Sequence, residues 1–222
     1  MMLDVAKIRN DFPILAREVY GKPLVYLDNA ASAQKPKPVL DAIMKSYTEE
    51  YANVHRGVHF LSNAATQAFE DARESVRRFL NAPSKDQLIF TRNATEAINL
   101  VAQSFGNLVI NEGDEIVLSI MEHHSNIVPW HFHRERRGAV IKWAPIDDDG
   151  NFLIDEFEKL LGPRTKMVAV THMSNALGTI VPVREVIKLA HARGIPVLVD
   201  GSQAAVHMKV DVQALEIGRA HV

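Results

Sequence analysis

The sequence predicts an α/β fold: a mostly parallel sheet with helices on both faces, preceded by an N-terminal helical arm. Three observations support this prediction. From about residue 87 onward, short runs rich in Ile, Val and Leu alternate with amphipathic stretches of helical period. Turn signals such as Glu112-Gly113-Asp114 bound the apolar runs. The first 80 residues differ, because they read as helices joined by loops.

Five apolar segments are predicted as buried strands: residues 87–91, 115–120, 140–143, 167–171 and 196–200. Four amphipathic segments between them are predicted as helices: residues 96–105, 127–137, 153–161 and 183–192. This alternation implies parallel strands whose connecting helices cover both faces. Ligands of open parallel sheets bind at the carboxyl ends of the strands. Residues that directly follow the predicted strands are therefore the site candidates.

The N-terminal arm is predicted to hold three helices, at residues 6–12, 38–51 and 62–80. The loops between them contain Gly21-Lys22-Pro23 and Lys35-Pro36-Lys37-Pro38. We therefore expect an arm over residues 1–80, an incomplete α/β domain over 81–215, and a tail over 216–222.

Composition excludes several classes of protein. The 222 residues are 47% hydrophobic and 23% charged, which is typical of a globular chain and not of a disordered one. A net charge of -2 gives no electrostatic reason to expect nucleic acid or an anionic membrane as partner. With no signal-peptide core at the N-terminus, we expect a cytoplasmic protein. The chain has no cysteine, which excludes disulfides, thiolate metal sites and a cysteine nucleophile of its own.

The first candidate segment, residues 91–99, follows a predicted strand and opens a helix. Small and hydroxyl residues at a helix start leave free N–H groups and the positive end of the helix dipole, which suits a phosphate. Alternatively, Asn93 or Thr95 is simply an N-cap.

The second segment contains His123 and His124, after the strand ending at Ile120. Adjacent side chains do not face one way, which disfavours a shared metal. One of the two could lie flat on an aromatic ligand or exchange protons near neutral pH; a structural histidine is the alternative. His131 and His133, which lie among arginines, are expected on a solvated helix face.

The third and fourth segments follow the last two strands. Residues 171–178 place hydrogen-bonding side chains, Asn175 among them, where the fourth strand ends; a polar turn closed by Gly178 is the alternative. Asp200 ends the last apolar strand, where a carboxylate is costly unless it is paired or hydrogen-bonded. A protonated pyridine nitrogen would be such a partner. Capping of the following turn is the alternative.

These segments, with residues 27–31 and 51–57, resemble the group II cysteine desulfurases and selenocysteine lyases, which are class V aminotransferases of pyridoxal-phosphate (PLP) fold type I. The resemblance covers residues 5–215. Its most specific part is the run Glu-His-His-Ser-Asn-Ile-Val-Pro-Trp at residues 122–130. That run favours desulfurases over other members of the same fold.

The resemblance implies PLP as cofactor and assigns roles to residues of the first two segments. Ala94 and Thr95 would contact the cofactor phosphate. His123 would stack on the pyridine ring and take part in proton transfer.

Further roles follow from the same resemblance. Asn175 and Gln203 would bond the region of the phenolic oxygen, and Asp200 would pair with the ring nitrogen. His55 and Arg56 would lie near the substrate. Ser202 stands where relatives often have alanine, a change expected to do little harm.

Several of the family's later features have no counterpart in the sequence. They are a lysine that binds PLP covalently, a substrate arginine, a catalytic cysteine on a mobile loop and a C-terminal domain. Lys209, the only lysine after Asp200, is expected on a surface loop and not as a substitute. Residues 217–222 read like a translated sequencing adapter, so we expect a non-native tail without a packing role. The chain is thus interpreted as an N-terminal fragment, inactive as given.

The parent enzyme implied by the resemblance would convert L-cysteine to alanine and a protein-bound persulfide for iron–sulfur cluster assembly. Selenocysteine is the other possible substrate. A sulfur-acceptor protein and a second copy of the chain, as homodimer, are the implied partners. Two alternatives stay open: a non-catalytic protein that binds PLP or pairs with a full-length partner, and a related PLP lyase or transaminase.

Overall fold

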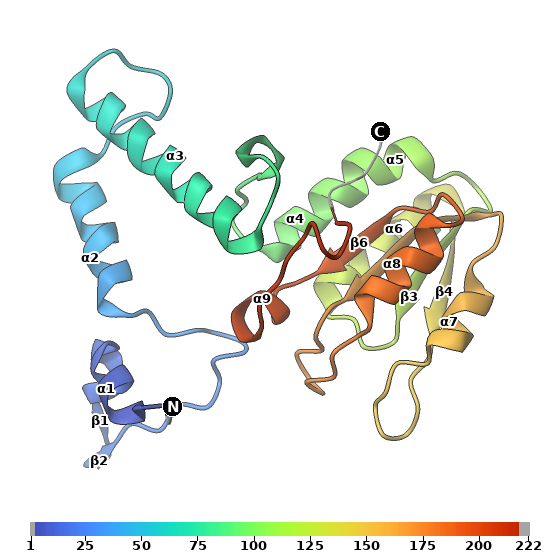
Figure 1. Cartoon of the computed structure of the whole chain (residues 1–222), viewed down its shortest axis with the longest axis horizontal. Coiled ribbons are helices and arrows are strands. Elements are labelled where there is room, and N and C mark those ends of the chain that lie inside the picture. The colour runs from blue at the N-terminus through green and yellow to red at the C-terminus, as the bar shows by residue number, and fades with distance from the viewer. Residues whose placement is uncertain (1–2, 218–222) are drawn as a thin grey trace. The chain divides into compact units, whose positions relative to one another are not determined.

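A computed structural model describes residues 3–217 of the chain (Figure 1). The chain divides into two units, Met1–Ser75 and Val76–Val222, and the boundary falls inside helix α3 (Phe60–Leu80). The predicted boundary, after residue 80, corresponds to the end of that helix. No helix within residues 3–217 has the length and apolar character needed to cross a membrane.

The second unit holds a parallel sheet of four strands: β3 (Glu115–Ser119), β4 (Val140–Ala144), β5 (Thr165–Thr171) and β6 (Val197–Asp200). The strand order is β4-β3-β5-β6, and every neighbouring pair is parallel. Four of the five predicted strands are therefore confirmed. Their carboxyl ends all lie at one edge of the sheet.

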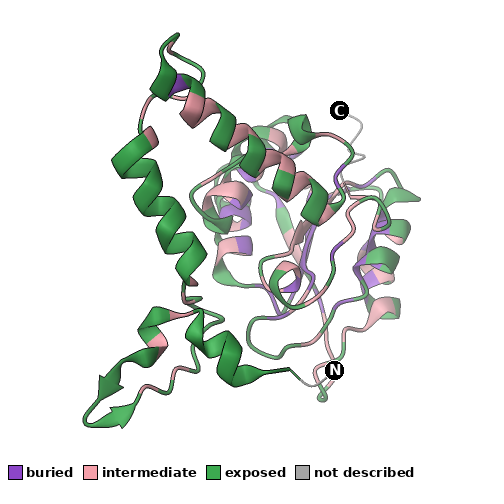
Figure 2. Ribbon diagram, turned by 60° about the vertical axis from the view of Figure 1, so that its left-hand side comes forward, coloured by how far each residue is buried: buried purple, intermediate pink, exposed green. Residues whose placement is uncertain are grey.

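Helices cover both faces of this sheet because successive strand residues point to opposite sides. Ile116 and Leu118 of β3 pack in one buried cluster with Trp130, from helix α6 (Val128–Arg137). Val117, between them, packs in a second cluster with side chains from α7 (Ile154–Leu160) and α8 (Val183–His191). The two central strands, β3 and β5, are almost entirely buried, and Figure 2 shows buried residues inside this unit. The predicted α/β class is confirmed.

The predicted strand over residues 87–91 is wrong. A 3₁₀ turn (Lys85–Gln87) occupies its start, and Leu88 continues with extended dihedral angles. Apolar residues favour an extended backbone, but a strand also requires a neighbour that pairs with it. Within residues 3–217, the four-stranded sheet contains no strand from this segment.

The predicted helix over residues 96–105 is α4 (Ala94–Val101), which continues as a π-helical turn, η4 (Ala102–Gly106), and the short α5 (Asn107–Val109). The Nε2 atom of His133 lies 2.8 Å from the carbonyl oxygen of Ala102 in this turn. His133 is only 5% exposed. The expectation that His133 lies on a solvated helix face is wrong, because its ring packs between α6 and the π turn.

The first unit contains α1 (Val5–Asn10), a 3₁₀ turn (Pro13–Ala16), α2 (Lys37–Lys45) with a π-helical end (Ser46–Glu50), and the start of α3. The three predicted helices are confirmed. A small hairpin of β1 (Glu18–Val19) and β2 (Lys22–Pro23) was not predicted. Its turn has positive φ at both Tyr20 and Gly21, as a type I′ hairpin turn requires.

The last described residues pack against the second unit. Leu215 and Ile217 contact the cluster under α7 and α8, and the Ile217 N–H donates to the Val212 carbonyl at 2.8 Å. The expectation of no packing role is thus wrong for Ile217. Residues 218–222 lie outside the described residues, and a non-native origin of the tail stays a prediction.

Candidate functional site

The loops that follow β3, β5 and β6 meet at the carboxyl edge of the sheet. Thr171 and Asp200 are paired in the register of β5 and β6, and the His172 N–H donates to the Asp200 carbonyl at 2.9 Å. Glu122, in the loop after β3, accepts a hydrogen bond from the Thr171 N–H at 2.8 Å. His123 and Asp200 therefore lie at the same edge, as the sequence predicted.

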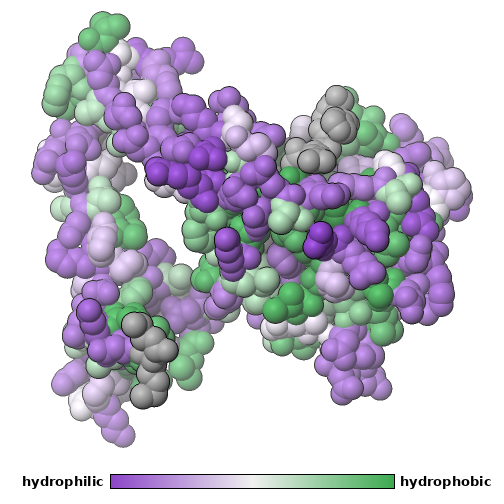
Figure 3. Space-filling view, viewed as in Figure 1, coloured by the Kyte–Doolittle hydropathy of each residue, from purple (hydrophilic) through white to green (hydrophobic). Residues whose placement is uncertain are grey.

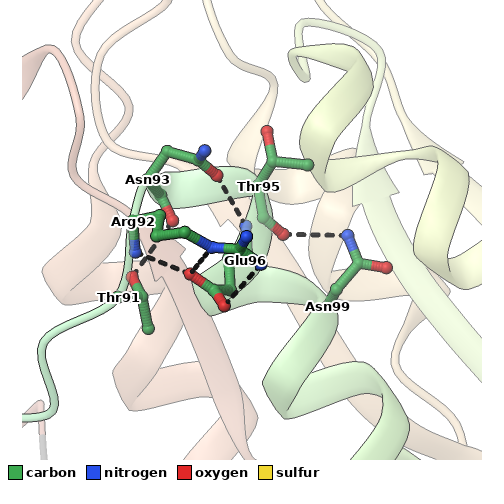
Figure 4. Close-up of polar contacts among 6 residues, drawn as sticks. All are labelled: Thr91, Arg92, Asn93, Thr95, Glu96 and Asn99. Carbon is green, nitrogen blue, oxygen red and sulfur yellow. Dashed lines mark hydrogen bonds and ion pairs between the residues drawn. The ribbon is translucent and has the colours of Figure 1, made fainter.

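Side-chain hydrogen bonds define the turn that begins α4 (Figure 4). Asn93 is the N-cap, since its Oδ1 accepts from the Glu96 N–H at 2.9 Å. The Glu96 carboxylate accepts from the Arg92 backbone N–H at 2.6 Å and from the Arg92 guanidinium at 3.1 Å. The hydrogen bonds from the Arg92 side chain and backbone lower the pKa of Glu96. Of the two N-cap alternatives, Asn93 has the role and Thr95 does not.

Thr95 is thereby left with a hydroxyl directed at the next loop. Its Oγ1 lies 2.7 Å from the Oγ of Ser125. The first-turn N–H groups of Ala94 and Thr95 have no acceptor within residues 3–217, as is usual at a helix start. Free N–H groups and a hydroxyl at the positive end of a helix are suited to an anion.

His123 is exposed and begins a 3₁₀ turn (His124–Asn126). Its Nδ1 atom accepts from the Ser125 N–H at 3.2 Å and lies 3.0 Å from the Ser125 hydroxyl. The rings of His123 and His124 are inclined at 66°, so they do not face one way. Ser125 thus links His123 to Thr95. Sequence reasoning missed Ser125.

Asp200, at the end of β6, is half-buried. Its Oδ1 accepts from the Ser202 N–H at 3.0 Å and from the Ser202 hydroxyl at 2.6 Å, so the turn-capping alternative holds for this oxygen. Its Oδ2 has no donor in the part of the chain that the structure describes. One carboxylate oxygen therefore remains for a cationic N–H of a ligand.

Asn175 and Gln203 lie on the loops after β5 and β6. Asn175 is exposed, and the Ser174 hydroxyl orders its loop by accepting from the N–H groups of Ala176 and Leu177 at 3.3 and 3.1 Å. Gln203 is half-buried and precedes the short α9 (Ala204–His207). Both residues come to the predicted edge, while their contacts with a ligand stay predictions.

Glu122 is a second residue that sequence reasoning missed. It is 8% exposed, and its carboxylate accepts from Ser119, Asn126 and the backbone of Thr171 at 2.5, 2.7 and 2.8 Å. Burial raises the pKa of Glu122, and the charge of Asp200 raises it further, against the effect of these hydrogen bonds. A carboxylate directly after an apolar strand was the available signal, the same one that singled out Asp200.

His55 and Arg56 belong to the first unit. His55 has a φ of 58°, a conformation that non-glycine residues rarely adopt. Its N–H donates to Thr66 Oγ1 at 3.0 Å, and its Nε2 lies 3.2 Å from a Glu70 carboxylate oxygen. Both partners belong to α3. The loop is thus held on its own helix, and a role of His55 and Arg56 near a substrate stays a prediction.

Comparison with known proteins gives the context of this site. The family model described as aminotransferase class-V matches residues 25–218. A cysteine desulfurase of Enterobacter sp. (strain 638) is 53% identical over 97% of this chain and 53% of its own length. A probable cysteine desulfurase of Mycolicibacterium paratuberculosis is 52% identical over 96% of this chain and 31% of its own length.

A solved structure agrees with these matches. The apo structure of a cysteine desulfurase from Thermococcus onnurineus NA1 superimposes with a TM-score of 0.89 at 38% identity, over 98% of this chain and 52% of that one. The chain thus spans about a third to a half of the length of these relatives. Because the family model matches most of its residues, the chain belongs to the aminotransferase class-V family.

Proposed function

We propose that this chain supplies the phosphate-binding and ring-binding part of a pyridoxal 5'-phosphate site in a cysteine desulfurase. The observation that carries the proposal is the hydrogen-bonded group of Thr95, Ser125 and His123, located at the same sheet edge as Asp200. Relatives about half identical to this chain bear the name cysteine desulfurase, which supports the assignment of the reaction.

The residues present fit this cofactor. The free N–H groups of Ala94 and Thr95 and the Thr95 hydroxyl suit its phosphate. The exposed ring of His123 offers a stacking face for the pyridine ring. Asp200 Oδ2, without a donor in residues 3–217, suits a protonated ring nitrogen. Asn175 and Gln203 would form hydrogen bonds in the region of the phenolic oxygen of the cofactor.

Each of these residues has a chemical task in the proposal. Pyridoxal phosphate, when bound, supplies an electron sink for the carbanion formed from the substrate. Asp200 keeps the ring nitrogen protonated through a charge-assisted hydrogen bond. His123 moves a proton at Nε2, since its Nδ1 accepts from Ser125. His55 and Arg56 would hold the substrate.

For the whole protein we propose removal of sulfur from L-cysteine, which gives L-alanine and a persulfide on a cysteine thiol. The sulfur would pass to an acceptor protein for iron–sulfur cluster assembly, in the cytoplasm, with the enzyme as a homodimer. L-selenocysteine is the other substrate to test. The 222 residues contain no cysteine, so they cannot form the persulfide themselves.

The proposal is tested by adding pyridoxal phosphate to the purified chain and measuring binding by absorbance and fluorescence. We expect reversible binding without a specific lysine adduct after borohydride reduction and mass spectrometry, and no alanine from cysteine. Asp200→Asn should weaken binding about tenfold, because one hydrogen bond to a charged group is lost. The exposed Asp155 provides the matched control, and Asp155→Asn should leave binding unchanged.

Two results would contradict the proposal. One is the absence of binding; the other is equal affinity of the Asp200→Asn variant and the parent chain. Stoichiometric labelling of one lysine together with turnover of cysteine would instead show that the chain is catalytic by itself. Size-exclusion chromatography with a full-length desulfurase tests the alternative of a non-catalytic partner protein. Co-elution of the two proteins would support that alternative.

A further inference from the structure

Three side chains from two elements form a continuous hydrogen-bonded chain at the sheet edge. Thr95 lies in the first turn of α4, and its hydroxyl oxygen is 2.7 Å from the hydroxyl oxygen of Ser125. The Ser125 hydroxyl lies 3.0 Å from the Nδ1 atom of His123. Ser125 is half-buried, while Thr95 and His123 are exposed toward the edge where the cofactor is proposed.

One backbone group, the Ser125 N–H, determines the direction of the hydrogen bonds that join Thr95, Ser125 and His123. The Ser125 N–H can only donate, and it donates to His123 Nδ1 at 3.2 Å. Nδ1 therefore carries no proton, and in the neutral ring the proton is on Nε2. Because Nδ1 can only accept, its 3.0 Å hydrogen bond with the Ser125 hydroxyl has the hydroxyl as donor, and the two donors share the Nδ1 lone pair. The oxygen of this hydroxyl is left to accept, so the Thr95 hydroxyl donates to Ser125.

We propose that Ser125 is a positioning residue that holds His123 in the Nε2–H tautomer and couples this tautomer to anion binding at Thr95. The geometry supports both parts. The Thr95 hydroxyl has a single proton, which it can donate to Ser125 or to an anion but not to both. An anion at Thr95 therefore removes the hydrogen bond that the Ser125 oxygen accepts, and this weakens the bond that the Ser125 hydroxyl donates to Nδ1, because linked hydrogen bonds polarise one another.

The coupling part rests on the proposed function, because it takes the cofactor phosphate as the anion. Its consequence is reciprocal: phosphate occupancy changes the tautomer balance of His123, and the tautomer of His123 changes phosphate affinity by the same factor. The tautomer part concerns the chain without any ligand. Each part can therefore be tested separately.

The test is a long-range proton–nitrogen NMR spectrum of the full chain labelled with ¹⁵N-histidine, recorded above neutral pH. His123→Gln identifies the His123 signals among the ten histidines. We expect an imine-type Nδ1 and a pyrrole-type Nε2 in the parent chain. Ser125→Ala should lower the ratio of the Nε2–H to the Nδ1–H tautomer about fivefold, as expected for one hydrogen bond of ordinary net strength.

Further variants distinguish the loss of the Ser125 hydroxyl from a general change in the structure. Ser125→Thr keeps the hydroxyl and should restore the ratio, and Thr95→Val should shift it by less than Ser125→Ala. Ser104→Ala is the matched control: it removes an exposed hydroxyl whose one hydrogen bond within residues 3–217 goes to the Leu100 carbonyl, and it should change nothing at His123. Ser125→Ala keeps the backbone N–H that donates to Nδ1, so an unchanged ratio would show that this N–H alone sets the tautomer and would overturn the role proposed for the Ser125 hydroxyl.

Pyridoxal phosphate, and pyridoxal without the phosphate, then test the coupling. Stacking of either probe on the His123 ring should move its signals, but only the phosphorylated probe should change the ratio of the two tautomers, and only in chains that retain the Ser125 hydroxyl. Binding seen by absorbance without a change in this ratio overturns the coupling and leaves the proposed function intact. Absence of binding overturns the coupling together with the proposed function, while the ligand-free spectra still decide the tautomer part.

Discussion

Glu122 positions the loop that carries His123 through hydrogen bonds whose directions cannot be reversed. The buried Trp130 has only an N–H donor, and this donates to Asn126 Oδ1 at 3.1 Å. The Asn126 amide nitrogen is thereby turned to Glu122 Oε2, while Thr171 donates its N–H to Oε1. Both carboxylate oxygens of Glu122 must therefore accept, and the loop is tied to β5 and α6.

Glu122→Gln should lower the free energy of unfolding by about 1–3 kcal/mol. The NH₂ group of the new side chain would face the N–H donor of Asn126 or of Thr171, so two donors would meet without an acceptor. Urea unfolding followed by circular dichroism measures the change. Glu135→Gln is the matched control: Glu135 is exposed on α6, where a charge loss should change the stability by less than about 0.5 kcal/mol.

The effect of Glu122→Gln should also depend on pH. Burial raises the pKa of Glu122 in the folded chain above its ordinary 4.5. Protonated Glu122 therefore stabilises the folded state. This stabilisation is fully present below pH 4.5 and is lost as the pH rises through the raised pKa of the folded chain. The difference in unfolding free energy between parent and variant should therefore be larger near pH 4.5 than at neutral pH. A difference that grows with pH would show that the folded pKa is lowered instead.

The π-helical turn after α4 depends on a glycine at its end. A Cβ added at Gly106 would lie 2.8 Å from Nε2 of His133, too close for two unbonded atoms. His133 cannot turn away freely, because it is buried, bonds to the Ala102 carbonyl and stacks on Trp130. The glycine thus permits the close approach of α6 to the π turn.

Gly106→Ala should destabilise the chain by about 1–3 kcal/mol, since overpacking exceeds the gain in helix propensity that alanine normally brings. Thermal unfolding gives the measurement. Gly162→Ala is the control, because its Cβ would meet its nearest neighbour, Glu115, at an ordinary 3.7 Å. A stabilised Gly106→Ala variant would show that His133 moves aside at little cost.

The first unit buries almost none of its apolar surface. Of the described residues 3–75, Ser62 alone is buried. One side of α2 and its π-helical end forms an apolar groove of about 510 Å³, lined by Val39, Ile43, Tyr47 and neighbouring side chains. Val39, Ile43 and Tyr47 are 43%, 49% and 69% exposed. Figure 3 shows hydrophobic side chains at the surface of both units.

We expect the purified chain to self-associate as its concentration rises, because exposed apolar patches of this kind favour association. Ile43→Glu combined with Tyr47→Glu should reduce the association, which light scattering can follow. Asp41→Asn is the control, since the side chain of Asp41 is exposed and pairs with Lys37 on the same helix. Equal association of parent and double variant would exclude this groove as the contact.

The sequence by itself determined the fold class, four of the five predicted strands and the edge at which the site is built. Apolar runs of strand length and amphipathic stretches of helical period are local properties, and parallel strands necessarily bring their carboxyl ends together. For this reason His123, Asn175 and Asp200 could be placed at one edge before any coordinates. Thr95 was placed there from the predicted strand over residues 87–91, which is wrong, and its position at the edge comes from its contact with Ser125.

Only the tertiary structure decided contacts between residues far apart in the chain. Residues 87–91 have the composition of a strand, but pairing with a neighbour decides whether a strand forms. The sequence signal at Glu122 names no partner, and Ser125 carries no signal of its own; both residues matter because Thr171 and Thr95 lie opposite them. The physical reason is that a hydrogen bond depends on distance and direction in space, which local periodicity does not contain.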